Sequence, residues 1–231
     1  QVMRATADLL APMWDRHLDR LFTGHRVVVS TFIVKHPGDA SAMTMHHEPT
    51  FVQDDVPTYN SWIPLVDVDA AAANGVLRLV PGSEDLPFGL VGFNTPPLFR
   101  RYEATFVEAS VGLDVPAGSA LVYDTRMLHW SEANHSKAPR PAIAAAIAPR
   151  SVPLVHVVAT GRRGREVHRV EASFFTDVHP AEVVDRIGLE GPLVDKLEEV
   201  PVLSPEAVAS ALGLPAPPVP ATVVPPDLAH L

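Results

Sequence analysis

Four residues of this chain have types and spacings that could build a metal site. His46 and Glu48 stand two positions apart, and His129 and Arg140 follow far downstream. Two imidazoles and one carboxylate are a donor set that holds a redox-active iron while leaving coordination positions open. If the chain is extended at 46–48, side chains two apart leave the same face of a strand. We therefore expect His46 and Glu48 to point into one site, which His129 reaches from a distant strand.

Each of these residues also has an ordinary explanation. The chain holds 11 histidines, so one His-x-Glu pattern arises easily by chance. His47 would face away from His46, and we expect it to be structural or to support the ligands. His129 is better supported, because a strand leaving the Pro-Ala-Gly turn at 116–118 would deliver it at its end. Arg140 opens an apolar strand, where its charge calls for a carboxylate partner.

Composition narrows the classes of protein. A chain of 231 residues is expected to form one domain, and no apolar run approaches the roughly 18 residues of a membrane helix. Without cysteine, any metal must use His, Asp or Glu. The net charge of −9 argues against nucleic-acid binding. We expect a cytoplasmic protein that acts on a small molecule, and interpret the basic run 162–165 as a solvated hairpin turn.

The periodicity predicts a mainly β protein. Leu10, Trp14, Leu18 and 21–22 form the apolar stripe of an N-terminal helix. Strands are predicted at 25–35, 59–66, 76–80, 105–115, 119–123, 142–148, 152–159 and 166–175. Residues 86–102 are expected to form a long loop over one end. Helices are predicted at 180–187 and from Ser204 to Gly213. Many short strands without alternating helices indicate a β-sandwich or jelly roll.

Several segments together resemble one known family. They are His-His-Glu at 46–48, Phe-Val at 51–52, Trp-Ile-Pro-Leu-Val-Asp at 62–67, Asn-Gly-Val-Leu at 74–77, Val-Pro-Gly-Ser at 80–83 and His-Trp-Ser at 129–131, with Arg140. In this order and spacing, over roughly residues 25–150, the chain resembles the phytanoyl-CoA dioxygenase family. Glu48 stands where that family usually has Asp, and Glu84 where it usually has His.

The resemblance implies a fold and a set of residue roles. The fold would be a double-stranded β-helix, a cupin-like jelly roll with flanking N- and C-terminal helices. The metal ligands and catalytic residues would be His46, Glu48 and His129. Arg140 would bind the distal carboxylate of 2-oxoglutarate as a bidentate fork, helped by Ser131, and Trp62 would line the cosubstrate pocket. Thr31 and Lys35 are further candidates for this pocket.

The same resemblance implies an activity and a domain organisation. The chain would be an Fe(II)/2-oxoglutarate-dependent dioxygenase that uses O₂ and releases succinate and CO₂ while hydroxylating or otherwise oxidising an aliphatic C–H group. One oxygenase domain would span 1–213, with a jelly-roll core at 25–150, an extra hairpin at 151–176 and C-terminal helices at 177–213. A Pro-rich tail would follow at 214–231. The loop at 86–102 would serve as a substrate lid.

Alternatives stay open at this point. The chain could be a cupin-like metal-binding protein, or a family member without catalytic activity. Arg140 argues against the first, because a simple metal site needs no carboxylate-binding arginine. A halogenase is disfavoured because Glu48 fills the position that halide would need. No cluster of basic residues suited to a CoA phosphate is apparent, so we expect a natural-product intermediate or an amino-acid-like substrate.

Overall fold

The computed structural model describes residues 2–53, 55–160, 164–177, 191–197, 199 and 201–221. The core consists of two four-stranded antiparallel sheets, which do not join into a closed barrel among the described residues. One sheet has the order β1 (His25–Lys35), β8 (Arg140–Pro149), β3 (Tyr59–Pro64) and β6 (Leu121–Asp124). The other has the order β2 (Met43–His46), β7 (His129–Ser131), β4 (Leu77–Leu79) and β5 (Val111–Leu113).

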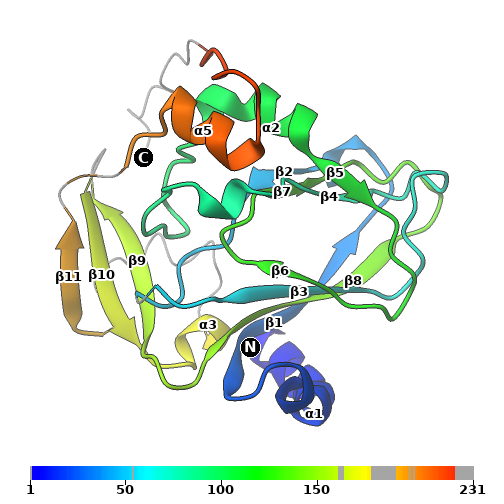
Figure 1. The fold of residues 1–231 in the computed structure, drawn as a ribbon. Helices are drawn as coiled ribbons and strands as arrows, with labels where there is room; N and C mark the ends of the chain where they lie inside the picture. Colours follow the sequence, from blue (N-terminus) through cyan, green and yellow to red (C-terminus); the bar gives the residue numbers. More distant parts are fainter. Residues whose placement is uncertain are drawn as a thin grey trace.

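The two sheets lie face to face, one above the other in Figure 1. Apolar side chains from both sheets pack between them, among them Trp62 and Tyr123 from the first and Leu77 and Leu79 from the second. Alternation along each strand places these residues on the inner faces. The predicted fold class, a mainly β jelly roll with flanking helices, is confirmed.

The N-terminal helix α1 (Val2–Leu21) covers the outer face of the first sheet (Figure 1). Leu10, Trp14 and Leu18 are its buried residues, as the periodicity predicted, and they pack against the isoleucines and Ala145 of β8. Trp14 Nε1 donates to Ser30 Oγ over 2.9 Å. The helix thus fixes β1 and β8, the two strands that carry Lys35 and Arg140.

A third sheet extends the fold on one side. It consists of β9 (Leu154–Thr160), β10 (Gly164–Val170) and β11 (Leu193–Leu197). The short helix α3 (Phe174–Asp177) lies between β10 and β11 in the chain. β9 and β10 form an antiparallel pair in the region where an extra hairpin was predicted, and the second strand ends at Val170 and not at 175. The basic run was predicted as a solvated turn, but β10 already begins at Gly164 and Arg165 is buried.

Helices and 3-10 turns cover the outside of the second sheet. Helices α2 (Glu103–Ala109) and α5 (Pro205–Leu212) lie above it in Figure 1. Short 3-10 turns lie at η1 (Asp39–Ser41), η2 (Ser83–Asp85) and η3 (Arg100–Tyr102). The prediction of α5 is confirmed: Ser204 Oγ accepts from Ala207 N, and Gly213 ends the helix with a φ of 62°.

Two predicted elements are wrong. Residues 105–115 were predicted as one strand, but α2 occupies their first part and only β5 is extended. Tyr102 and Phe106, four positions apart, are both buried in the cluster beneath α5, a spacing that suits a helix. Residues 177–213 were predicted to be helical, but 193–197 form β11. The helix predicted at 180–187 lies outside the described residues, as does the tail beyond 221.

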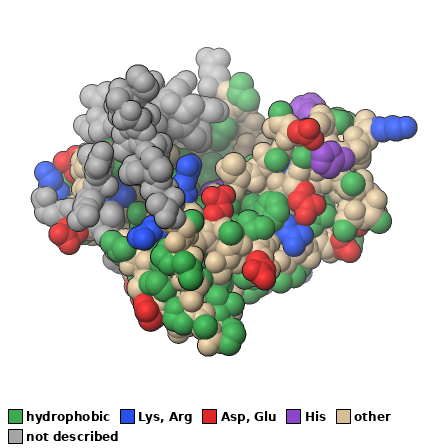
Figure 2. Space-filling model, turned by 90° about the horizontal axis from the view of Figure 1, so that it is seen from above, with side chains coloured by type: hydrophobic (Ala, Val, Ile, Leu, Met, Phe, Trp, Pro, Cys, Tyr) green, Lys and Arg blue, Asp and Glu red, His purple; other side chains and the backbone are tan. Residues whose placement is uncertain are grey.

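The surface carries both signs of charge. Seen from above, acidic and basic side chains of the described residues are interspersed with apolar ones (Figure 2).

None of the described helices combines the length and the apolar character that crossing a membrane requires.

Candidate metal centre

His46 and His129 lie opposite each other on two adjacent strands of the second sheet. They are Cα partners in the β2–β7 ladder, and their ring centroids lie 4.2 Å apart. With Glu48 they form a group whose candidate ligand atoms all lie within 4.8 Å of one another. The structure therefore brings together the three residues that were predicted to bind metal, although His129 lies far from His46 and Glu48 in the sequence.

The local backbone differs from the expectation in two respects. β2 ends at His46, and Glu48 N instead donates to Thr125 O over 2.9 Å. His129 was expected at the end of the strand that leaves the 116–118 turn. That strand, β6, ends at Asp124, and after a turn His129 opens the separate strand β7 in the other sheet. The change of sheet is what places His129 opposite His46.

Backbone carbonyl groups orient both imidazoles in the same way. His46 Nδ1 lies 2.8 Å from Thr44 O, and His129 Nδ1 lies 3.0 Å from Met127 O. A carbonyl oxygen only accepts, so Nδ1 carries the hydrogen in each ring and Nε2 is left with a lone pair. This is the arrangement that metal-binding histidines adopt when their second nitrogen is held by a hydrogen bond. The donor set therefore fits a divalent metal such as iron.

Asn60 and Tyr123 support the carboxylate, and sequence reasoning missed both. Asn60 Nδ2 donates to Glu48 Oε1 over 2.7 Å and to Tyr123 Oη over 2.9 Å. The Tyr123 ring also meets His129 edge to face, with centroids 5.0 Å apart. Asn60 and Trp62 are two apart on β3 and share its inner face, which was a usable signal in the sequence.

The electrostatics of the group favour a neutral His46 imidazole beside an ionised Glu48 carboxylate. Burial lowers the pKa of His46, and the neighbouring His129 lowers it further. Burial alone would raise the pKa of Glu48, but its contact with His129 and the nearby His46 and His47 hold that pKa below its ordinary value. His129 Nε2 and Glu48 Oε1 are 3.6 Å apart. The pKa shifts of His46 and Glu48 thus both favour the protonation state that metal binding requires.

Arg140 is buried without an anionic partner among the described residues. It is 2% exposed, and its Nε and Nη1 atoms have no hydrogen-bond partner. Its guanidinium lies over the Trp62 ring, 5.0 Å from the centroid, and burial lowers its pKa to about 10. No carboxylate of the described residues provides the partner that the sequence led us to expect for Arg140. An uncompensated buried charge is costly, so this pocket favours an incoming anion.

A second cation lies beside Arg140. Lys35 is its Cα partner across β1 and β8, and Lys35 Nζ donates to Glu132 O over 2.8 Å. Burial and the adjacent Arg140 lower the pKa of Lys35 to about 8. Thr31, the other residue suggested for this pocket, opposes Ala144 on the same pair of strands. Thr31 and Lys35 both lie on β1, the strand that pairs with the Arg140 strand β8. Of the two, Lys35 adds a positive charge beside Arg140.

Strand β3 links the surroundings of Arg140 to the metal-binding group. On β3, Asn60 contacts Glu48 while Trp62 contacts Arg140, two residues or roughly 7 Å further along the strand. On β7, buried Ser131 lies two residues beyond His129. Ala142, Ala144 and Ala146 face inward on β8 opposite these strands.

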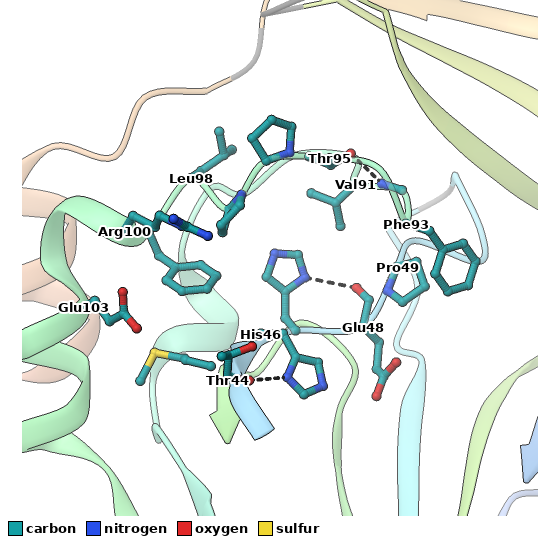
Figure 3. Close-up of a pocket in the computed structure, with 16 residues that line it drawn as sticks. Thr44, His46, Glu48, Pro49, Val91, Phe93, Thr95, Leu98, Arg100 and Glu103 are labelled. Carbon is teal, nitrogen blue, oxygen red and sulfur yellow. Dashed lines mark hydrogen bonds between the residues drawn. The ribbon is translucent and has the colours of Figure 1, made fainter. Parts of the chain in front are cut away.

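A cavity of about 540 Å³ opens on the side of His46 and Glu48. Figure 3 shows both residues at its base and Phe93, Thr95, Leu98 and Arg100 along the segment that arches over it. Most of that segment belongs to the loop predicted at 86–102, whose position over the site agrees with a substrate lid. Arg140 does not line this cavity.

The fold and the three converging donors define a jelly-roll protein with a candidate metal centre. The family model of phytanoyl-CoA dioxygenase (PhyH) matches residues 3–142, which is more than half of the chain. The chain belongs to the phytanoyl-CoA dioxygenase family, and the resemblance inferred from its motifs is confirmed. No curated protein matches the sequence.

Solved structures with a similar fold exist. The epimerase SnoN, in complex with Fe3+, alpha ketoglutarate and nogalamycin RO, is 19% identical with a TM-score of 0.50; the match covers 86% of this chain and 73% of SnoN. The carbocyclase SnoK is 23% identical over 56% of this chain and 53% of its own, with a TM-score of 0.47. EvdMO1 is 22% identical over 55% of this chain and 28% of its own, with a TM-score of 0.43.

The chain thus spans 53% of SnoK and 28% of EvdMO1, less than two thirds of either chain. Iron and 2-oxoglutarate (alpha ketoglutarate), the cofactor and cosubstrate expected from the sequence, are both bound in the SnoN complex, together with nogalamycin RO. The His-Glu-His group of this chain is a donor set that iron accepts.

Proposed function

We propose that this protein is an Fe(II)/2-oxoglutarate-dependent dioxygenase that oxidises an aliphatic C–H group of a small metabolite. In this proposal His46, Glu48 and His129 hold the iron. The observation that carries the proposal is Arg140, a buried guanidinium whose Nε and Nη1 atoms lack partners. A protein that only bound metal would gain nothing from this unpaired charge, whereas a dicarboxylate cosubstrate would neutralise it.

Each residue has a defined task in this proposal. The Arg140 guanidinium binds the distal carboxylate through two parallel N–H groups, and Trp62 holds the guanidinium plane in place. Ser131 adds a hydroxyl from β7 in the opposite sheet. Met127 O and Thr44 O keep the two imidazoles turned with Nε2 toward the metal position. The protein therefore orients the reactants before any chemistry begins.

With O₂, the bound iron supplies oxidative decarboxylation of 2-oxoglutarate to succinate and CO₂, coupled to removal of hydrogen from the substrate. The chain must keep this reaction away from water and from its own side chains. The segment over the cavity, with Phe93 and Leu98, provides an apolar cover on the substrate side. We propose hydroxylation of a natural-product or amino-acid-like intermediate as the outcome.

The test is succinate formation from 2-oxoglutarate by the purified protein, with and without Fe(II). Slow decarboxylation without substrate suffices, so the assay does not depend on knowing the metabolite. We expect succinate to form only with iron and O₂ present, and Arg140→Ala to require far more 2-oxoglutarate. Protein that binds iron but forms no succinate would support a metal-binding or non-catalytic family member instead. Because SnoN is described as an epimerase, substrate products should be analysed for mass and for configuration.

A further inference from the structure

The segment 90–95, which lies over the substrate cavity, is attached to the third sheet at strand β9. Among the described residues β9 is an edge strand of that sheet, paired with β10. Ala159 N donates to Asn94 Oδ1 over 2.9 Å, and Asn94 Nδ2 donates to Ala159 O over 3.4 Å. One side-chain amide thus pairs with both backbone groups of one edge residue, as a neighbouring strand would. Asn94 therefore joins the segment to the sheet.

A glycine brings the segment close to the same strand. A Cβ atom placed on Gly92 would lie 1.7 Å from Val157 O, a separation that real Cβ atoms do not show. Only a residue without a side chain can therefore occupy position 92 while the segment lies against β9. Gly92 N also donates to Thr95 Oγ1 over 2.8 Å, and Thr95 N donates to Gly92 O over 3.0 Å. These two bonds close the turn that carries Asn94.

Apolar contacts add to this attachment. Leu90 packs against a cluster of buried valines on β9 and β10, which are Val155, Val157 and Val167. The centroid of the Phe93 ring lies 6.3 Å from that of His156 on β9. The segment therefore contacts the third sheet through its backbone, through one polar side chain and through apolar side chains.

The same segment forms part of the cavity wall. The cavity of about 540 Å³ has His46 and Glu48 at its base, and four residues of the segment line it (Figure 3): Val91, Gly92, Phe93 and Thr95. The family match ends at residue 142, whereas β9 begins at Leu154. A part of the chain outside the family match therefore holds one wall of the cavity in place.

We propose that the third sheet limits the size of the molecules that the cavity admits, and that Gly92 and Asn94 are the positioning residues through which it does so. This inference rests on the proposed oxygenase function, because it concerns the access of a substrate to the metal centre. The hydrogen bonds of both residues go to the segment itself and to β9, and none goes to the three candidate ligands. Releasing the wall should therefore widen the cavity while iron and 2-oxoglutarate still bind.

Thiol labelling measures the position of the wall, because the chain has no cysteine of its own. Val91→Cys places one thiol on the wall, at a side chain that is 7% exposed. This thiol is labelled with a small reagent, methyl methanethiosulfonate, and with a large one, fluorescein maleimide. The ratio of the two rates is compared with the ratio at an exposed thiol, His17→Cys. If the wall opens and closes faster than the thiol reacts, each rate follows the population of the open wall.

Val91→Cys alone should react much more slowly with the large reagent than with the small one. Adding Asn94→Ala should raise the rate with the large reagent by about three- to tenfold for each hydrogen bond lost, so that the ratio approaches that of the exposed thiol. Asn94→Asp keeps one acceptor and should restore part of the difference. Gly92→Ala should have the larger effect, because its methyl group does not fit against β9. Lys196→Ala, exposed on β11 at the opposite edge of the sheet, is the control and should change neither rate.

Two further measurements separate a moved wall from a general loss of stability. A thiol introduced by Ala145→Cys, at a side chain that is 2% exposed and packs against α1, reports unfolding of the whole domain. Asn94→Ala should leave the labelling of this thiol unchanged. The visible charge-transfer band of Fe(II) chelated by 2-oxoglutarate should keep its wild-type intensity in Asn94→Ala.

An unchanged ratio of labelling rates in both Asn94→Ala and Gly92→Ala would overturn the proposal. So would an equal rise in labelling at Ala145→Cys, or loss of the band in Asn94→Ala when wild type shows it. If Gly92→Ala does not fold, Asn94→Ala and Asn94→Asp decide. Absence of the band in wild type would count against the oxygenase function on which this inference rests, whereas a normal band with an unchanged ratio would count against this inference alone.

Discussion

His46 and His129 are direct partners across the antiparallel pair β2 and β7, with ring centroids 4.2 Å apart. Burial and the neighbouring His129 lower the pKa of His46. The strand pairing therefore holds two nitrogen donors together before a metal arrives. Fold formation should not depend on iron, unlike in small domains that need metal to fold.

Asn60→Ala should weaken iron binding although Asn60 is not a ligand. Asn60 holds Glu48 Oε1 at 2.7 Å, and loss of such a supporting hydrogen bond typically costs about 10- to 100-fold in metal affinity. Tyr123→Phe removes the other partner of Asn60 but leaves the bond to Glu48, so its effect should be smaller. Anaerobic Fe(II) titrations of both variants measure this. Equal affinity in Asn60→Ala and wild type would exclude a positioning role.

Glu48→Asp should retain part of the activity, because the charge stays and the reach shortens by one methylene group. Glu48→Ala should lose 2-oxoglutarate-dependent oxidation and leave a coordination position that chloride could occupy. Succinate formation and iron affinity are compared across wild type and both variants. If Glu48→Ala oxidises as well as wild type, the carboxylate is not a ligand.

Arg140→Ala should weaken 2-oxoglutarate binding by about 10- to 1,000-fold or more. Removing one partner of a buried hydrogen-bonded charge pair costs roughly 2–5 kcal/mol, at about 1.4 kcal/mol per tenfold. Iron affinity should hardly change, because Arg140 contacts Trp62 and not the three donors. Arg140→Lys should recover only part of the loss, since an ammonium group lacks the two-pronged geometry.

The measurement for Arg140 is the 2-oxoglutarate dependence of succinate formation, with an iron titration of the same variants. An unchanged requirement for 2-oxoglutarate would refute the assignment of Arg140. It would also restore the reading of this chain as a cupin-like metal-binding protein.

Local sequence signals predicted much of the fold and the candidate ligands. A β-branched run predicted β1, an apolar run predicted β8, and the Ser204–Gly213 capping pattern predicted α5. The segment 103–109 was misjudged because Thr, Phe and Val favour strands, while the burial of Phe106 beneath α5 is a tertiary effect. β11 was missed because its alternation is weak and its pairing with β10 is non-local.

In the candidate site, too, local sequence signals revealed some residues, while non-local contacts determine the roles of others. His46, Glu48, His129 and Arg140 carry recognisable types and spacings, so a motif could reveal them. The spacing of Asn60 and Trp62 shows that they share a face of β3, but the role of Asn60 depends on a hydrogen bond between β3 and the segment after β2, which no local pattern records. The sequence also did not show that His47 lines the cavity beside His46 and Glu48. The strand ends at His46, so strict alternation no longer describes the next residue.

Acid should destabilise the fold through buried histidines. Burial, with a contribution from His168, lowers the pKa of His156 to about 4, compared with about 6.5 in an unfolded chain. The unfolded state therefore binds a proton more readily, and the contribution of His156 to stability, complete above about pH 6.5, is lost as the pH falls toward 4. We expect His156 to account for about 1–2 kcal/mol of the decrease between pH 7 and pH 5.

Urea unfolding of wild type and His156→Phe at the two pH values checks this expectation. The phenyl ring can keep the contact with Phe174, whose centroid lies 4.9 Å from the imidazole, while the titration is removed. His156→Phe should lose less stability on acidification than wild type, with exposed His17→Gln as the control. An identical decrease in all three proteins would contradict the shift at His156.

The central claim is that His46, Glu48 and His129 bind Fe(II) in a site where the iron also binds 2-oxoglutarate. An anaerobic titration tests it directly, because chelation of Fe(II) by the 2-oxo acid produces a visible charge-transfer band that neither component gives alone. Wild type should develop this band at one iron per chain, and His46→Ala and His129→Ala should not develop it while keeping the wild-type far-ultraviolet spectrum. A full band in either folded variant, or no band in wild type with both components present, would contradict the claim.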